Sequence, residues 1–319
     1  MARPVTEDSG ATRRDQAARA AWLYYVGGMT QDQIAQELGI SRQRAQRLVA
    51  MAGSEGLIRV RIDHPIGECL ELERALRDRF GLKLARVAPG LGGGQDPLRA
   101  LAPFAAPEVE RIFSAPEPQL VALGTGRTLR AVIEQMQPVD GGRHRVVSLI
   151  GNVSPDGSAS FYEVIMRVAD KTGAPHYPMA VPVMARDPEE LAVFRGLPHV
   201  RNTFALAQTA DLALVGIGQM DEGAPLRADG FITAEQHAAL RDAGAAGEIC
   251  SHIFDAEGRY LDHPINALMV GQRLPVAGAM TLCLGAGASK VRPLRAALKG
   301  RLIDGLITDE TTAAALLAG

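Results

Sequence analysis

The sequence predicts two domains: a small helical domain at the N-terminus, followed by an α/β domain built on a doubly wound parallel sheet. Two patterns and the length predict this. Residues 13–52 place apolar side chains at helical spacing. From Lys83 onward, short apolar runs alternate with amphipathic stretches, which is typical of parallel strands connected by helices. The 319 residues suffice for two domains, which we place at 1–62 and 63–319.

The helical domain is predicted to hold three helices. The first spans residues 13–26. The second follows Thr30, a good N-cap residue, and stops at Gly39. The third begins after Ser41, also a good N-cap residue. The side chains expected to pack together are Ala17, Ala20, Ala21 and Tyr24 in the first helix, Ile34, Ala35 and Leu38 in the second, and Ala45, Leu48, Val49 and Ala52 in the third. Two short helices joined by a tight turn that contains Gly predict a helix-turn-helix.

The polar face of this unit is rich in Arg and Gln. The outward positions at the starts of the second and third helices are Thr30, Gln31, Ser41, Arg42, Gln43, Arg44, Gln46 and Arg47. Arg and Gln form bidentate hydrogen bonds with base edges in the major groove, and Arg and Ser also contact phosphates. The alternative is a helical hairpin with a solvated basic face. Residues 1–62 carry a net charge of +3 and residues 63–319 carry −5, which favours contact with double-stranded DNA at the N-terminal end.

Two segments follow the three helices. Residues 56–65 alternate like a short strand, and Pro65 ends it, so this segment resembles the wing of a winged helix. Residues 67–82 form a charged amphipathic helix. We expect this helix to connect the domains or to pack in an interface between subunits.

The α/β domain is predicted to contain eight strands and five helices. The strands are 82–88, 119–124, 145–151, 176–183, 211–218, 247–254, 280–286 and 303–309. The helices are 127–137, 159–173, 233–243, 289–299 and 310–317. In such sheets a ligand binds at the carboxyl ends of the strands.

Two glycine-rich turns lie where a predicted strand passes into a helix. The first is formed by Gly124, Thr125, Gly126, Arg127 and Thr128. Glycines allow a ligand to approach the backbone, and the amides of the helix N-terminus donate hydrogen bonds. The second turn precedes Lys290, a cation that opposes the helix dipole unless an anion or carboxylate lies nearby. The alternatives are a plain strand-to-helix turn and a solvated lysine. The first turn is neither a Walker A loop nor a GxGxxG motif, so it does not indicate a nucleotide.

Four carboxylates and one amide are further candidates. Glu248 and Asp255 are expected to accept hydrogen bonds from sugar hydroxyls, although lone carboxylates are weak signals. Asn152 follows a strand end and serves equally well as a turn residue. We interpret Asp309 and Glu310 as first-turn residues of a helix capped by Thr308 rather than as a catalytic pair.

Composition narrows the class of protein. There is no apolar run of 18 residues or more and no apolar leader near the N-terminus, so the sequence predicts neither a membrane span nor secretion. The three cysteines are far apart and match no metal spacing, which favours buried reduced thiols in a cytoplasmic protein. We predict no metal site, no cofactor and no catalytic residue.

The sequence resembles the SorC family of sugar-binding transcriptional regulators over nearly its whole length. The stretch LYYVGGMTQDQIAQELGISRQRAQRLV is similar to the family's DNA-binding unit. The stretches LGTGRTL, VGIG, GEICSHIFDAEG and GASKVRPLRAALKGRLIDGLITDETTAAALL are similar to its effector domain, in the same order. The resemblance implies an effector domain with the fold of sugar-phosphate isomerases and deaminases. It also implies ligand contacts at Gly124 to Thr128, Glu248 and Lys290.

The function implied by this resemblance is control of a carbohydrate or polyol operon. The expected partners are operator DNA and a small sugar, polyol or sugar-phosphate effector, and the protein is expected to form a homodimer or homotetramer. The alternative is a sugar-phosphate isomerase or deaminase fused to a DNA-binding domain. The deaminases carry a catalytic Asp-Gly-His run where this chain has Asp221-Glu222-Gly223, with no histidine behind it. An architectural DNA-binding protein would not need the α/β domain.

Overall fold

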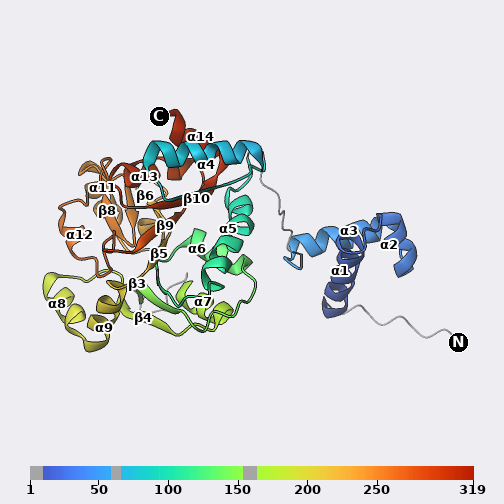
Figure 1. Ribbon diagram of the computed structural model, residues 1–319, viewed down its shortest axis with the longest axis horizontal. Helices are drawn as coiled ribbons and strands as arrows, with labels where there is room; N and C mark the ends of the chain where they lie inside the picture. Colours follow the sequence, from blue (N-terminus) through green and yellow to red (C-terminus); the bar gives the residue numbers. More distant parts are fainter. Residues whose placement is uncertain (1–9, 59–65, 93, 154–163) are drawn as a thin grey trace. The chain divides into compact units, whose positions relative to one another are not determined.

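A computed structural model describes residues 10–58, 66–92, 94–153 and 164–319. The chain forms two compact units, within residues 1–62 and 63–319 (Figure 1). The N-terminal unit contains the three expected helices, α1 (Gly10–Tyr25), α2 (Gln31–Leu38) and α3 (Arg42–Ser54). The wing predicted at 56–65 falls largely on residues 59–65, which lie outside the described residues.

Local capping explains where α2 and α3 begin. Thr30 and Gln33 form a capping box, in which each side chain accepts a hydrogen bond from the other residue's backbone amide. Ser41 caps α3, and its hydroxyl accepts from the Arg44 amide at 3.3 Å. The shared core consists of Ala17, Ala20, Ala21, Ile34, Ala35, Ala45, Leu48, Val49 and Ala52. Tyr24 was expected in this core but is 38% exposed, because the neighbouring Leu23 packs there instead.

The second unit is built on a sheet of seven parallel strands. They are β1 (Leu84–Ala88), β2 (Leu120–Leu123), β3 (Arg145–Val153), β4 (His176–Pro182), β5 (Leu212–Val215), β9 (Met280–Leu284) and β10 (Gly305–Asp309). Their order is β1-β10-β9-β5-β2-β3-β4. From β2 the chain adds β3 and β4 on one side, and it then adds β5, β9 and β10 on the other. The sheet is therefore doubly wound, with its switch point between β2 and β5.

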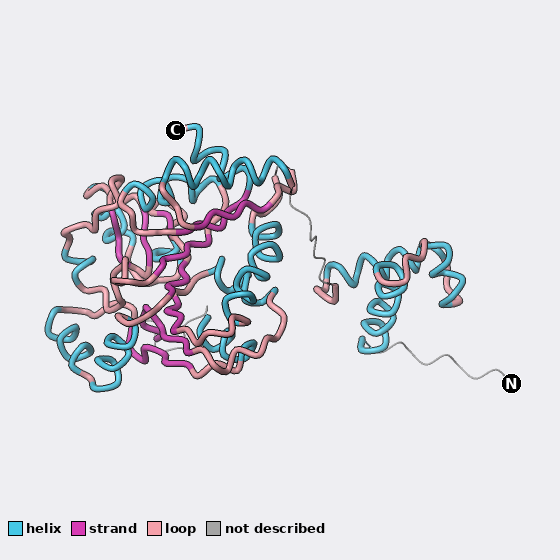
Figure 2. Tube along the Cα trace, viewed as in Figure 1, coloured by secondary structure: helices cyan, strands magenta, loops and turns pink. Residues whose placement is uncertain are grey.

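Helices cover both faces of the sheet (Figures 1 and 2). One face packs against α4 (Gly67–Phe80), α9 (Pro198–Ala207), α13 (Ala288–Lys299) and α14 (Glu310–Ala318). The other packs against α5 (Leu98–Phe113), α6 (Arg127–Gln135) and α7 (Val164–Thr172). Successive residues of β2 alternate between the two cores, with Ala122 in the first and Val121 and Leu123 in the second. This double burial explains why the strands are continuous apolar runs.

The segment 247–254 is not a strand of this sheet, contrary to expectation. It folds into a hairpin of β7 (Gly247–Ile249) and β8 (His252–Phe254), which joins β6 (Gly218–Gln219) in a small antiparallel sheet. Cys250 and Ser251 make the reversal, with φ of 50° and 68°. Residues 211–218, expected as one strand, divide between β5 and β6 for the same reason: only the first part belongs to the parallel sheet.

The remaining helices lie in connections. They are α8 (Pro188–Gly196), α10 (Pro225–Ala228), α11 (Ala234–Asp242) and α12 (Pro264–Ala267). Residues around α10 and α11 form a separate apolar cluster with Met220, Ile253 and Met269. This cluster stands beside the small antiparallel sheet and forms part of the wall of the cavity described next.

Candidate functional site

The starts of α2 and α3 present the side chains expected to contact DNA. Thr30, Ser41, Arg42, Gln43, Arg44, Gln46 and Arg47 are exposed, and Gln31 is partly exposed. The opposite face of α3, with Ala45, Leu48 and Val49, is buried. Amides at the start of this helix add positive potential at the same end, which suits a DNA phosphate. The side chains expected to read bases and to contact phosphates are therefore exposed on this unit.

Neighbouring helices orient two of these arginines. The Nη2 atom of Arg44 donates to Oε1 of Gln16 in α1 at 3.0 Å. The Nε atom of Arg42 lies 3.4 Å from Oδ1 of Asp32 in α2. Both arginines are thus positioned by the folded unit and not by α3 alone, which lowers the entropy lost when they contact a ligand.

A cavity of about 390 Å³ lies at the carboxyl ends of β2, β5 and β9, at the switch point of the sheet. We call it the central cavity. Of the candidate residues, it brings together Gly124, Thr125, Gly126, Arg127, Thr128, Glu248 and Lys290. Its volume lies within the range of small-molecule sites. Segments separated by more than 160 residues therefore meet at one edge of the sheet, as the two glycine-rich turns predicted.

The two turns have the same construction. Gly126 and Gly287 precede α6 and α13 with φ of 124° and 106°, a conformation that favours glycine. Neither helix has a side-chain cap, so amides of the first turn are available to a ligand. The Gly287 amide itself donates to Oγ1 of Thr312 in α14 at 2.8 Å. This bond fixes the second turn against the C-terminal helix.

Glu248 and Lys290 both line the cavity, and each affects the pKa of the other. One Glu248 oxygen accepts from the Ser251 amide at 2.8 Å, and Nζ of Lys290 donates to Oε1 of Gln219. Burial raises the pKa of Glu248, although the Ser251 amide and Lys290 oppose the shift. Burial lowers the pKa of Lys290, and Glu248 opposes that shift. Lys290 is therefore a partly buried lysine with a carboxylate nearby, which offsets its position at a helix N-terminus.

Several residues of the cavity wall are not apparent from the sequence. Asp229, at the end of α10, pairs with Arg127 at 3.7 Å between Oδ1 and Nη2. Asp96, Gln219 and Phe231 also line the cavity. They lie in loops and short elements whose position depends on tertiary packing. A local signal existed at Gln219, which follows Gly216 and Gly218 in the segment after β5.

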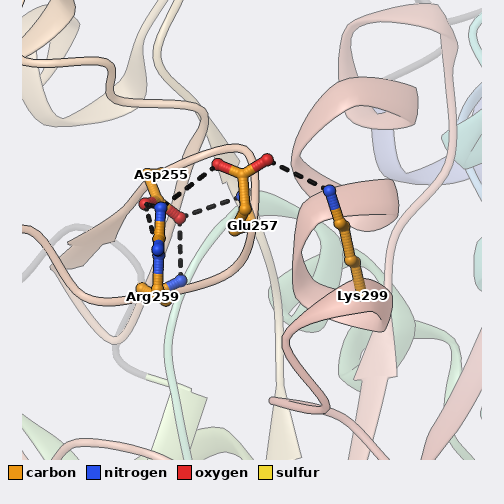
Figure 3. A network of polar contacts seen from close by, with 4 residues as sticks. All are labelled: Asp255, Glu257, Arg259 and Lys299. Carbon is orange, nitrogen blue, oxygen red and sulfur yellow. Dashed lines mark hydrogen bonds and ion pairs between the residues drawn. The ribbon is translucent and has the colours of Figure 1, made fainter.

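Two candidates do not line the cavity. Asp255 accepts hydrogen bonds from the amides of Glu257 and Arg259 and pairs with the Arg259 guanidinium at 2.9 Å (Figure 3). Burial alone would raise the pKa of Asp255, but these hydrogen bonds together lower it. The network continues through Glu257 to Lys299. Asn152 lies within β3, and its buried Oδ1 has no hydrogen-bond partner among the described residues.

The carboxylates considered for catalysis have structural contacts. The N-cap of α14 is Asp309 and not Thr308 as expected, because β10 continues through Thr308 to Asp309. Glu310 accepts from the Gly90 amide at 2.9 Å. Asp221 accepts from the Gly223 amide at 3.0 Å, in a turn outside the cavity lining. Within the described residues, no three His, Cys, Asp or Glu side chains are grouped so that they could hold a metal ion.

Two further expectations concern the cysteines and membrane spans. Cys69, Cys250 and Cys283 are free and buried, as expected. Burial raises the pKa of each thiol, to about 12 for Cys283. Among the described helices, none has both the length and the apolar character required to cross a bilayer.

Comparison with known proteins gives matches over both units. A family model described as a sugar-binding domain matches residues 64–318, and a homeodomain-like model matches residues 11–58. The erythritol catabolism regulatory protein EryD of Brucella abortus (strain 2308) is 37% identical over 302 residues, with 94% of this chain and 96% of EryD covered. The transcriptional regulator LsrR of Enterobacter sp. (strain 638) is 32% identical over 314 residues, covering 96% and 94%.

A solved structure shares the architecture. The full-length sorbitol operon regulator SorC from Klebsiella pneumoniae superposes with a TM-score of 0.70 at 27% identity, covering 95% of this chain and 99% of that one. A DeoR family transcriptional regulator from Listeria monocytogenes gives a TM-score of 0.71 at 22% identity over 78% of this chain, which shows the fold alone.

Proposed function

Since this chain belongs to the SorC family of sugar-binding transcriptional regulators, we propose that it controls a carbohydrate or polyol catabolic operon in response to a small effector. The effector is a sugar, a sugar alcohol or a sugar phosphate, and it binds in the central cavity. The observation that carries the proposal is the meeting of both glycine-rich turns, Glu248 and Lys290 around this cavity, in a chain that also presents an exposed Arg- and Gln-rich helix.

The cavity and the DNA-reading face belong to separate compact units. An effector in the second unit therefore changes DNA affinity only if it binds one arrangement of the protein more tightly than another. We propose that the protein acts as a homodimer or homotetramer in the cytoplasm, because one three-helix unit contacts few base pairs. Half-sites should then lie one helical turn, or a multiple of it, apart.

Fluorescence anisotropy tests this function with a DNA duplex selected by the protein from a random library. Sugars, polyols and their phosphate esters are added in turn, and a compound that changes DNA affinity is the effector. Lys290→Ala and Thr128→Val should keep DNA binding without effector and lose the response. Lys299→Ala, a change at an exposed lysine outside the cavity lining, is the matched control. If both cavity variants respond like the parent, the effector binds elsewhere.

The alternative function, a sugar-phosphate isomerase or deaminase, makes a different prediction for the same protein and compounds. Turnover of a sugar phosphate by the purified protein would support an isomerase or deaminase. The relatives are named as regulators, and in this chain the Asp221 carboxylate is engaged by the turn that contains it. We therefore favour regulation over catalysis.

A further inference from the structure

The wall of the central cavity carries charges of both signs. Its basic side chains are Arg127 and Lys290, and its acidic side chains are Asp96, Asp229 and Glu248. The N-termini of α6 and α13, which also meet the cavity, each contribute about half a positive charge. These contributions nearly cancel. The cavity is thus close to electrically neutral before any ligand enters.

Both cations of the wall already have acidic neighbours. Arg127 lies 3.7 Å from Asp229, in an ion pair between α6 and the end of α10. Lys290 donates to Gln219 and is close enough to Glu248 for each group to affect the pKa of the other. A phosphate group would have to compete with these carboxylates for both cations.

The net charge of the Lys290–Glu248 pair is the same whether the shared proton is on the Lys290 amine or on the Glu248 carboxylate. Burial disfavours the charged form of each group, which raises the pKa of Glu248 and lowers that of Lys290. If the proton moves from the ammonium group to the carboxylate, both groups become neutral. The pair has zero net charge in either state, so the balance of the cavity is kept.

We infer that the central cavity binds an uncharged polyhydroxylated molecule, a sugar or a sugar alcohol, in preference to its phosphate ester. This inference rests on the proposed function and narrows its effector. Glu248 accepts hydrogen bonds from hydroxyl groups, while Lys290 and the first-turn amides of α6 and α13 donate to them. A phosphate monoester would bring a charge of about −1.5 to −2 into a cavity without surplus positive charge, and removing such a charge from water is costly.

Isothermal titration calorimetry on the full-length protein tests this with pairs of compounds that differ only in a phosphate: erythritol, sorbitol and mannitol against their monophosphates, and glucose against glucose 6-phosphate. For each skeleton that binds, we expect the neutral member to bind at least about tenfold more tightly. Its affinity should change less than about twofold between roughly 50 and 300 mM KCl, because screening acts on charged ligands. A phosphate ester that binds more tightly than its neutral partner overturns the inference.

A charge variant provides a second test. Asp229→Asn removes one carboxylate from the wall with little change of shape, so it should raise the affinity for the phosphate ester relative to the neutral member by about tenfold. Asp242→Asn, at the exposed end of α11 outside the cavity lining, should leave the ratio unchanged. An unchanged ratio in Asp229→Asn contradicts the charge argument.

Anisotropy with DNA separates this inference from the proposed function. A phosphate ester that binds more tightly than its neutral partner and changes DNA affinity overturns the inference and supports the function. A neutral compound that binds in the cavity of the wild type, loses binding in Lys290→Ala and leaves DNA affinity unchanged supports the inference and contradicts the function.

Discussion

At the scale of single residues, Gly218 determines where Glu248 can lie. A methyl group at Gly218 would be 2.0 Å from Oε1 of Glu248, closer than any contact allows. The atoms in the way are Oε1, Cδ and Cγ of a partly buried side chain that also accepts from the Ser251 amide, so Gly218→Ala should displace the carboxylate and lower the stability of the protein. We expect effector affinity to fall by about tenfold or more, as for the loss of a charged hydrogen bond, and the melting temperature to fall because the bond between Glu248 and the Ser251 amide is lost.

Calorimetry and thermal melts measure these two effects separately. Gly223→Ala is the control, since a methyl group there makes only an ordinary contact with Asp221, 3.4 Å away, and lies outside the cavity lining. Full effector affinity in Gly218→Ala would mean that Glu248 does not contact the effector.

His252 is the residue that should make stability depend on pH. Burial lowers its pKa to about 4, and the neutral ring donates through Nε2 to the Gly271 carbonyl at 2.8 Å. In the unfolded chain the imidazole has its ordinary pKa of about 6.5. Between pH 6.5 and 4 the unfolded state therefore binds one more proton than the native state, and stability falls as the pH falls. The expected loss is about 3 kcal/mol over this window.

Urea unfolding at a series of pH values measures this loss. His252→Gln should be less stable at pH 7, and its stability should fall less steeply than that of the wild type between pH 6.5 and 4. His176→Gln, at an exposed histidine, should keep the full slope. Parallel curves for wild type and His252→Gln would assign the acid sensitivity to other groups.

At the scale of elements, variants of α3 test the hypothesis that this helix contacts the bases of the operator. Arg44 and Gln43 lie in its first turn and are exposed, and Gln16 orients Arg44. Replacing a base-reading side chain by Ala should cost about 1–3 kcal/mol and relax specificity at one position of the operator. Arg19→Ala, at an exposed arginine of α1, serves as the control. Binding measured on a panel of single-base operator variants would show unchanged selectivity if neither residue reads bases.

Elements with strong local signals were predictable, and those set by tertiary contacts were not. Capping residues and apolar spacing predicted both ends of α2 and the start of α3. The helix α5 was missed because Pro103 and Pro107 lie inside it, yet its apolar face packs on the sheet and overrides that cost. The β7–β8 hairpin was missed because its reversal at Cys250 and Ser251 uses no glycine or proline.

The candidate site shows the same division. Turns that join a strand to a helix can be recognised locally, and so Gly124 to Thr128 and Lys290 were found. Asp229 could not be found, because it reaches the cavity only through the packing of α10. Asp255 was predicted to contact the effector, but it pairs with Arg259 instead. Arg259 lies four residues away in a turn that the sequence alone does not define.

At the scale of the whole molecule, a series of contacts connects the cavity to α4, the first helix of the α/β unit. The Gly287 amide at the cavity donates to Thr312 in α14, and α14 packs along α4, where Arg79 donates to the Leu317 carbonyl (Figure 1). The helix α4 is the first described element after the DNA-binding unit. Contiguous contacts of this kind can carry coupling between sites when they have two arrangements.

Thr312→Val should weaken this coupling. The valine keeps the shape of the side chain and removes the nearer acceptor of the Gly287 amide, leaving Oδ1 of Asp309 at 3.4 Å. We expect DNA binding without effector to persist, while the change in DNA affinity on adding effector falls severalfold. Thr209→Val, at an exposed threonine outside the cavity lining, is the control. If Thr312→Val keeps the full change in DNA affinity on adding effector, the coupling does not depend on the Gly287–Thr312 contact with α14.

The sheet order gives the cavity a mechanical property. Its two glycine-rich turns belong to parts of the chain that fold on opposite sides of the switch point, one with β3 and β4 and the other with β10. An effector that contacts both turns acts as a clamp across the middle of the sheet. Pulling the two halves apart would then require breaking the ligand contacts. The bound effector should therefore raise the force needed to unfold this unit and slow its cleavage by proteases that attack the opened sheet.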